Sequence, residues 1–352
     1  MKFDVLIIGG GLAGLTCGIR LQKNGVKCAI VSTGQSALHF SSGSFDLLNE
    51  LPDGTKVDNP MAAVGKVSAN HPYAKLGSEF AYYVHEAKQQ FLDLGIEVAG
   101  DAEQNHLRIT PMGTLKPTWL TFSDFTPFSS ASDMAGKKIR VVNMAGFLDF
   151  NTKFVADSFE KYGAKCQISS INLPELERLR ISPTEMRSTN IARVLENEKT
   201  LEALIMELAG TVSGFDVVAL PAVFGLSSVA PVRRLKEALN IPVWLIPTMP
   251  PSVPGIRAQQ QLRRSFEELG GVYMLGDTVV KADFKGNKVQ SVYSVNHGDI
   301  SFVAENFVLA SGSYFSNGLI AQPDKVIEPV FGSDVDFTPG RDSWYDKSSP
   351  TS

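Results

Sequence analysis

The chain has 352 residues, of which 43% are hydrophobic and 20% are charged, so it can bury a large core and is neither disordered nor fibrous. This length suggests about two domains. The formal net charge of -4, with no basic excess, argues against a nucleic-acid-binding protein. The 3 cysteines are far apart and match no disulfide, zinc or iron–sulfur spacing, so we expect no metal site and a cytoplasmic protein.

Two stretches exclude export and membrane spanning. The N-terminal run MKFDVLIIGGG contains Asp4 and several glycines, unlike a signal peptide. The long uncharged stretch 238–256 is interrupted repeatedly by proline, which rules out a spanning helix. We therefore expect any membrane contact to be peripheral or to go through a partner.

The first 32 residues predict a βαβ unit. A strand at 4–8 leads through a glycine turn into a helix at 12–23, and a second strand follows at 26–32. A Ser/Gly-rich loop at 34–46 comes next. We then predict a helix at 79–94 and a loop-rich aromatic segment at 100–135.

Alternating patterns resume after residue 137 and predict a second α/β layer. Beyond a proline cluster, a last helix and a group of strands return to the first layer. The predicted strands are 138–143, 165–171, 215–220, 243–246, 272–275, 278–283, 288–295 and 306–310, and the predicted helices are 151–162, 184–196, 201–209, 232–239 and 258–269.

These elements predict an α/β fold: a Rossmann-like FAD/NAD(P)-binding-type flavin domain with a parallel sheet, interrupted by an inserted α/β domain. Residues 1–48 and 251–333 would form the flavin domain. Residues 49–250 would form the inserted substrate or partner domain, and 334–352 a polar tail.

The Gly9-x-Gly11-x-x-Gly14 motif is the strongest functional signal. Its first glycine permits the tight turn, the second lets the backbone approach a phosphate, and the third lets helix and strand pack closely. The free N–H groups of Leu12 and Ala13, at the start of the helix, would face the phosphate. The motif predicts a nucleotide or flavin site, and the alternative is a turn that needs glycine for its shape alone.

The residue at the end of the second strand departs from the usual pattern. An acidic side chain normally holds the adenosine ribose there, but this chain has Ser32. The departure weakens the case for NAD most. It suits FMN, which has no adenosine ribose, and leaves FAD as the alternative.

Two further segments are candidates for contact with the flavin. The loop around Ser41, Ser42 and Gly43 offers hydroxyl and N–H groups for a ring edge, and His39 beside it could transfer protons. The alternative for this loop is a surface turn with an incidental histidine. The late strand at 306–310 ends in Ala310, Ser311 and Gly312, which are small enough for a close approach to the glycine turn.

Arg257 follows the proline cluster near the start of a helix, where it could bind a carboxylate or a phosphate as a second catalytic candidate. The alternative is a solvated arginine at a helix end.

Several stretches resemble the B subunits of bacterial anaerobic glycerol-3-phosphate dehydrogenases. The resemblance covers nearly the whole chain and is carried by residues 2–48, 111–120 (PMGTLKPTWL), 190–198 (NIARVLENE), 247–257 (PTMPPSVPGIR) and 308–319 (VLASGSYFSNGL). It implies oxidation of sn-glycerol 3-phosphate to dihydroxyacetone phosphate, with electrons passed to quinone in fumarate or nitrate respiration.

The resemblance also implies FMN on the B subunit and two partners. These are a catalytic A subunit and a membrane-associated iron–sulfur C subunit, which would hold the protein peripherally at the inner face of the cell membrane. Family members continue past a tail like 334–352 into a Gly-rich strand–helix segment, and this chain stops before it. The alternatives are a B subunit that only relays electrons, a flavin-free structural adaptor, and a stand-alone FAD oxidoreductase acting on another small acid.

Overall fold

A computed structural model describes residues 1–337, except for the side chain of Pro183. These residues form two compact units. Unit 1 contains residues 1–38, 52–54 and the described residues from 259 onward, and unit 2 contains 39–51 and 55–258. Residues 39–48 and 251–258, which the sequence placed in the first domain, thus belong to unit 2. Of the predicted polar tail, 338–352 lie outside the described residues.

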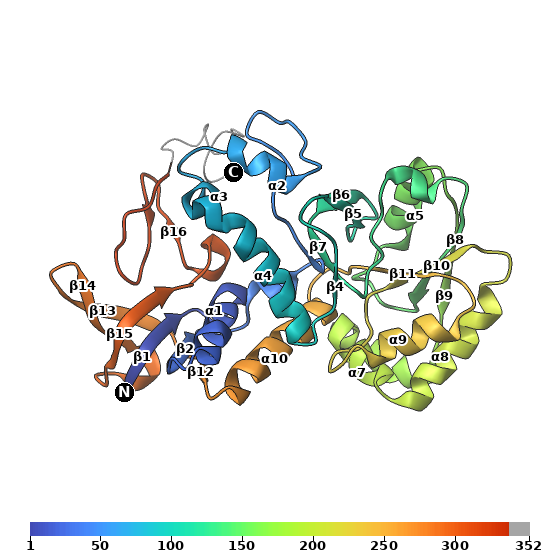
Figure 1. The fold of residues 1–352 in the computed structure, drawn as a ribbon. Coiled ribbons are helices and arrows are strands. Elements are labelled where there is room, and N and C mark those ends of the chain that lie inside the picture. Colours follow the sequence, from blue (N-terminus) through green and yellow to red (C-terminus); the bar gives the residue numbers. More distant parts are fainter. Residues whose placement is uncertain (338–352) are drawn as a thin grey trace. The chain divides into compact units, whose positions relative to one another are not determined.

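Unit 1 is built on a six-stranded sheet whose first four strands are parallel and whose last two are antiparallel (Figure 1). Its order is β12 (Val272–Leu275), β2 (Cys28–Ser32), β1 (Lys2–Ile8), β15 (Phe302–Leu309), β14 (Lys288–Ser294) and β13 (Val279–Lys285). The central strands are buried because their runs are almost wholly apolar.

Helix α1 (Leu12–Lys23) has the predicted bounds, and α10 (Val253–Glu268) begins earlier than predicted. Pro254 falls in the first turn of α10, where the missing N–H is no loss, so the helix starts within the proline cluster. In unit 1, Gly18 of α1 lies against the ring of Phe266, so close that a Cβ there would be 2.7 Å from it. Glycine therefore allows these two helices to pack.

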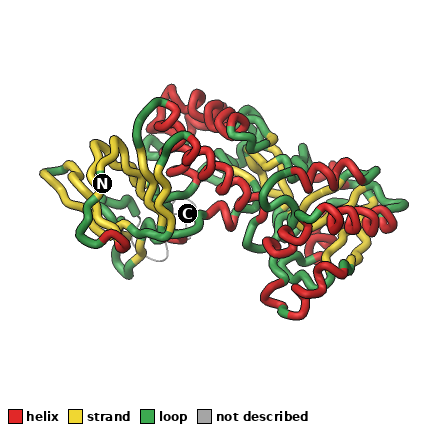
Figure 2. The backbone as a smooth tube through the Cα atoms, turned by 90° about the horizontal axis from the view of Figure 1, so that it is seen from below, coloured by secondary structure: helices red, strands yellow, loops and turns green. Residues whose placement is uncertain are grey.

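Unit 2 contains a four-stranded parallel sheet in the order β11 (Val243–Ile246), β10 (Val217–Pro221), β8 (Lys138–Met144) and β9 (Lys165–Ile171). Helix α5 (Thr152–Lys161) lies on one side of it, and α8 (Glu198–Thr211) and α9 (Ala230–Ala238) lie on the other (Figure 1). Figure 2, in which helices are red and strands are yellow, shows that each unit contains both helices and strands. The α/β fold class is thereby confirmed.

The segment 100–135, predicted as loop-rich, also contains short strands that the prediction missed. It forms a hairpin, β5 (His106–Ile109) with β6 (Leu115–Thr118), followed by β7 (Leu120–Phe122) between β3 (Ser44–Phe45) and β4 (Val98–Ala99). Its aromatic side chains are buried, and Phe128 packs edge-on against Trp244 with ring centroids 4.8 Å apart. Burial of these rings outweighs the turn tendency of the prolines.

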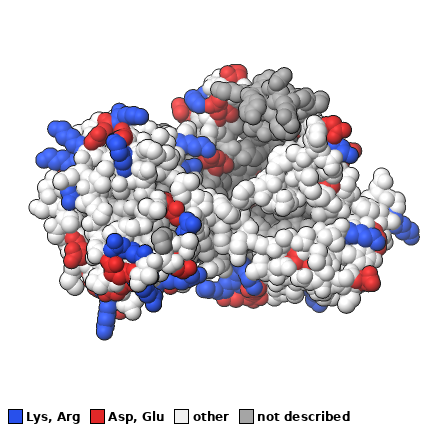
Figure 3. All heavy atoms as spheres, turned by 180° about the vertical axis from the view of Figure 1, so that it is seen from behind, with Lys and Arg blue, Asp and Glu red and all other residues white. Residues whose placement is uncertain are grey.

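Other elements differ from prediction only at their ends or are short. They include α7 (Ser188–Leu195), α4 (Phe80–Asp93), α2 (Pro60–Ala63), α3 (Pro72–Leu76), α6 (Glu177–Ile181), β16 (Ile320–Ala321) and β17 (Val326–Ile327). Among the described residues, no helix combines the length and apolar character needed to cross a bilayer. Figure 3 shows acidic and basic side chains intermingled on the face it presents.

Candidate functional site

The glycine turn of unit 1 is shaped by two contacts that leave no room for a side chain. Gly9 has φ +114°, and a Cβ on it would lie 2.1 Å from the carbonyl oxygen of Ala310. A Cβ on Gly14 would lie 1.9 Å from the carbonyl oxygen of Gly9. Any larger residue at either position would therefore distort the turn.

Gly11 differs from its neighbours because the space beside it is open. It is the N-cap of α1, and the only atom of residues 1–337 that its Cβ would meet within 4 Å is the Cβ of Ser36, at 3.7 Å. Gly11 has no side chain to cap α1, so the N-cap residue itself does not engage the N–H groups of Leu12 and Ala13. An uncapped N-terminus next to an open glycine fits a phosphate group.

The rest of the turn is supported by hydroxyl groups. Tyr273 on β12 donates a 3.1 Å hydrogen bond to the carbonyl of Gly10. Ser32 is 5% exposed, and its hydroxyl donates to the carbonyl of Gly34 at 3.1 Å. The serine that replaces the usual acid is thus already engaged. Sequence reasoning missed Tyr273, because no local pattern shows that β12 lies beside β2.

The late strand lies where the sequence placed it. β15 runs parallel to β1, and the N–H of Ala310 donates to the carbonyl of Ile8 at 2.8 Å. The carbonyl of Ser311 accepts a 2.8 Å hydrogen bond from Ser316, and Gly312 has φ +88°. Unit 1 therefore brings the glycine turn, Ser32 and this small-residue segment together, and their contact with flavin stays a prediction.

The loop residues from 39 to 43 belong to unit 2. His39 is half-buried, its carbonyl accepts a 2.7 Å hydrogen bond from the N–H of Ser252, and burial lowers the pKa of its imidazole. The imidazole is therefore neutral near pH 7 and able to accept a proton. Gly43 is needed for packing, because a Cβ there would lie 2.0 Å from the ring of Phe125.

Ser41 makes a hydrogen bond within this loop. The N–H of Gly43 donates to the hydroxyl of Ser41 at 3.0 Å, and Ser42 is half-buried. The structure thus gives Ser41 and Gly43 roles within unit 2. Their predicted flavin contacts, and that of Ser42, stay predictions.

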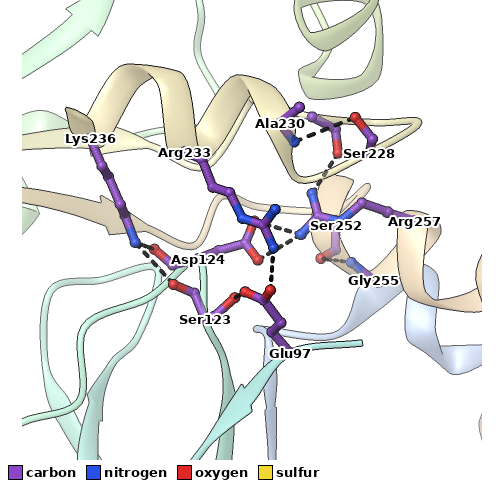
Figure 4. A network of polar contacts seen from close by, with 11 residues as sticks. Glu97, Ser123, Asp124, Ser228, Ala230, Arg233, Lys236, Ser252, Gly255 and Arg257 are labelled. Atoms are coloured by element: carbon purple, nitrogen blue, oxygen red, sulfur yellow. Dashed lines mark hydrogen bonds and ion pairs between the residues drawn. The ribbon is translucent and has the colours of Figure 1, made fainter. Parts of the chain in front are cut away.

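Arg257, the second catalytic candidate, is held by groups of its own unit (Figure 4). Its Nη2 donates to both carboxylate oxygens of Asp124 at 2.6 Å, and its Nη1 donates to the carbonyl of Gly225 at 2.5 Å. Lys236 on α9 donates to the carbonyls of Ser123 and Asp124 at 2.9 and 2.8 Å. This network joins the turn after β7 to α9 and α10.

Comparison with known proteins adds the family. Residues 4–350 match the family model described as FAD binding domain. The chain is 44% identical over 349 residues to the B subunit of anaerobic glycerol-3-phosphate dehydrogenase from Yersinia enterocolitica, a match covering 98% of this chain and 82% of the relative. The chain belongs to this B-subunit family of FAD-binding-domain proteins. The corresponding B subunit of Pectobacterium atrosepticum is 43% identical over 348 residues, covering 98% and 83%.

These findings confirm the family resemblance, a flavin cofactor and an oxidoreductase function. Both relatives are named as one subunit of a dehydrogenase, which makes them parts of a multisubunit complex. Among solved structures, glycine oxidase from Bacillus cereus aligns with 14% identity over 89% of this chain and 56% of its own, with a TM-score of 0.32. That score is too low to support a functional comparison.

Proposed function

We propose that this chain is the flavin-carrying subunit of a quinone-linked anaerobic glycerol-3-phosphate dehydrogenase. The enzyme would oxidise sn-glycerol 3-phosphate to dihydroxyacetone phosphate in fumarate or nitrate respiration. The observation that carries this proposal is the open Gly11 at the uncapped start of α1, in a chain of the B-subunit family. Crowding at Gly9 and Gly14 and open space at Gly11 are the pattern that a bound phosphate requires.

Several of the predicted site residues have a definite task in this proposal. The N–H groups of Leu12 and Ala13 would hold the flavin phosphate, and the segment 310–312 would line the ring. His39, neutral at pH 7, would accept the proton of the substrate hydroxyl. The flavin itself supplies an acceptor for a hydride or for two electrons.

The choice between FMN and FAD depends on the end of β2. Ser32 is the residue in the position of the usual ribose-binding acid, and its hydroxyl already bonds Gly34. This favours FMN, because FMN has no adenosine ribose to hold. The description of the matching family names FAD, which remains the alternative.

The partners and the location follow from the same family. We propose an A subunit as the catalytic partner and an iron–sulfur C subunit that attaches the complex to the inner face of the cell membrane. The sequence contains 3 cysteines, fewer than the four that ligate a usual iron–sulfur cluster, so we propose that a partner holds such a cluster. The chain itself would then be cytoplasmic and peripheral.

A second role, electron relay alone, is favoured by one observation. Arg257, the cationic candidate for binding substrate, is already paired with Asp124. If substrate binds only to the A subunit, this chain would receive electrons and pass them on.

The visible spectrum of the purified chain, followed by analysis of the cofactor released on denaturation, tests the proposal. We expect flavin absorbance and free FMN, whereas released FAD would identify the alternative cofactor. Glycerol 3-phosphate added without oxygen should bleach the flavin if this chain oxidises substrate, and only the complete complex should bleach if it is a relay. A colourless chain that takes up neither flavin would contradict the proposal and support a flavin-free adaptor.

A further inference from the structure

The β5–β6 hairpin of unit 2 (Figure 1) brings basic residues of its two strands into cross-strand register. His106 pairs with Thr118, and Arg108 pairs with Lys116 across the hairpin. Cross-strand partners lie on the same face of a hairpin, and so do residues two apart on one strand, about 7 Å from each other. These four side chains therefore share one face, which we call the hairpin face.

Arg108 is the unusual member of the hairpin face. It is only 7% exposed, and its buried Nε and Nη1 atoms find no hydrogen-bond partner within residues 1–337. Burial lowers the pKa of its guanidinium, and the nearby Asp46 raises it. The Asp46 carboxylate, however, bonds the ammonium of Lys116 at 3.0 Å. A buried guanidinium with two free donors is costly unless something else accepts them.

His106 has a further polar atom without a partner, two residues from Arg108 on the same strand. Its Nε2 lies 2.6 Å from the hydroxyl of Thr121, while its buried Nδ1 has no partner in the described part of the chain. Burial lowers the pKa of this imidazole, so it is neutral near pH 7. The hairpin face therefore carries unsatisfied polar atoms on both side chains.

We infer that the hairpin face is an oxyanion site that binds the phosphate monoester group of the substrate, with Arg108 as its main ligand. This inference rests on the proposed function. The two cations Arg108 and Lys116 outnumber the one carboxylate, Asp46, so an anion is the matching ligand. The planar fork of a guanidinium suits phosphate oxygens.

Thr118, the fourth residue of the hairpin face, already has a partner. The hydroxyl of Thr118 donates to the carbonyl of Phe45 at 3.1 Å. Lys116, the cross-strand partner of Arg108, is exposed, with 51% of its side chain accessible. The segment 111–120, part of the family resemblance, thus supplies one strand of the proposed site.

Calorimetric titration of the flavin-loaded full chain tests this inference, with inorganic phosphate, glycerol 3-phosphate and glycerol as probes. We expect Arg108→Gln to weaken the binding of both phosphate compounds about 10- to 100-fold, because a charge-assisted bond is lost. Arg108→Lys, which keeps the charge but loses the fork, should lie between. Arg187→Gln is the matched control, because the guanidinium of Arg187 already pairs with Asp149 in unit 2, and it should change affinity less than about twofold.

Steady-state kinetics of the assembled complex give an independent readout. We expect Arg108→Gln to raise KM for glycerol 3-phosphate by a similar factor while kcat changes little, as for a lost binding interaction. Near-ultraviolet circular dichroism verifies that each variant is folded. If Arg108→Gln does not fold, Arg108→Lys decides the question on the same titration.

The outcomes separate this inference from the proposed function. Phosphate binding that depends on Arg108, in a chain whose flavin glycerol 3-phosphate never reduces, would support the oxyanion site and count against the dehydrogenase. Wild-type affinity and KM in folded Arg108 variants would overturn the oxyanion site and leave the dehydrogenase intact.

Discussion

Unit 2 contains two arginines that are largely shielded from water but differ in whether their N–H groups have hydrogen-bond partners. The side chain of Arg257 is 14% exposed and bonds both oxygens of Asp124 and the carbonyl of Gly225. Arg108 is 7% exposed, yet two of its nitrogens have no partner in residues 1–337. The same residue type can thus be fully paired in one buried place and keep unsatisfied donors in another. Satisfaction of its donors, more than burial, distinguishes the two roles.

The largest effect on stability is expected from removing the paired arginine, Arg257. Arg257→Met leaves the carboxylate of Asp124, itself 2% exposed, without its cation, so we expect the free energy of unfolding to fall by about 3–5 kcal/mol. Urea denaturation of the full chain measures this loss. The double variant Arg257→Met with Asp124→Leu is the control and should recover much of it. A loss below about 1 kcal/mol would mean that the pair is not part of the framework.

Removing the unpaired arginine should have the opposite sign. Arg108→Met deletes a buried charge with unsatisfied donors, so we expect the phosphate-free chain to gain about 1–2 kcal/mol of unfolding free energy. Added phosphate should raise the Tm of the wild type but not of the variant, because a ligand stabilises only a chain that binds it. Destabilisation comparable to that of Arg257→Met would show that Arg108 also serves the fold.

The smallest expected effect concerns pH. Burial lowers the pKa of His39 and of His106 below the usual 6.5, so the unfolded chain takes up these protons before the folded chain does. Stability is therefore full above pH 6.5 and is lost as the pH falls toward the lowered pKa values. We expect His106→Gln and His39→Gln each to flatten this loss in denaturation series between pH 7.5 and about 5. Slopes identical to the wild type would contradict the lowered pKa values.

The local sequence pattern was sufficient to predict the bounds of elements that depend mainly on their own residues. The predicted bounds of α1, β9, β11 and β12 agree with the structure, because caps, glycines and β-branched runs determine them locally. The position of Ala310 beside the glycine turn was also predictable, since small residues at a strand end permit close approach. The open space at Gly11 follows the same motif.

Long-range contacts were not predictable. Tyr273 supports Gly10 from a strand more than 250 residues away, and Asp124 pairs with Arg257 across 133 residues. The segment 100–135 became a hairpin and a strand because its aromatic side chains found a core elsewhere in unit 2. The unpaired donors of Arg108 were also not predictable, because a sequence does not show which partners a buried group lacks.

The flavin content of Gly11 variants tests the central claim, that this chain holds flavin on its glycine turn, most directly. Gly11 has φ -80° and open space beside it, so Gly11→Val should leave the fold intact while its side chain blocks the phosphate. Gly210→Ala is the matched control, because a Cβ on this residue of α8 meets nothing within 4 Å. The account predicts that Gly11→Val is purified folded and colourless and that Gly210→Ala keeps the flavin of the wild type. Wild-type flavin content in folded Gly11→Val would contradict it.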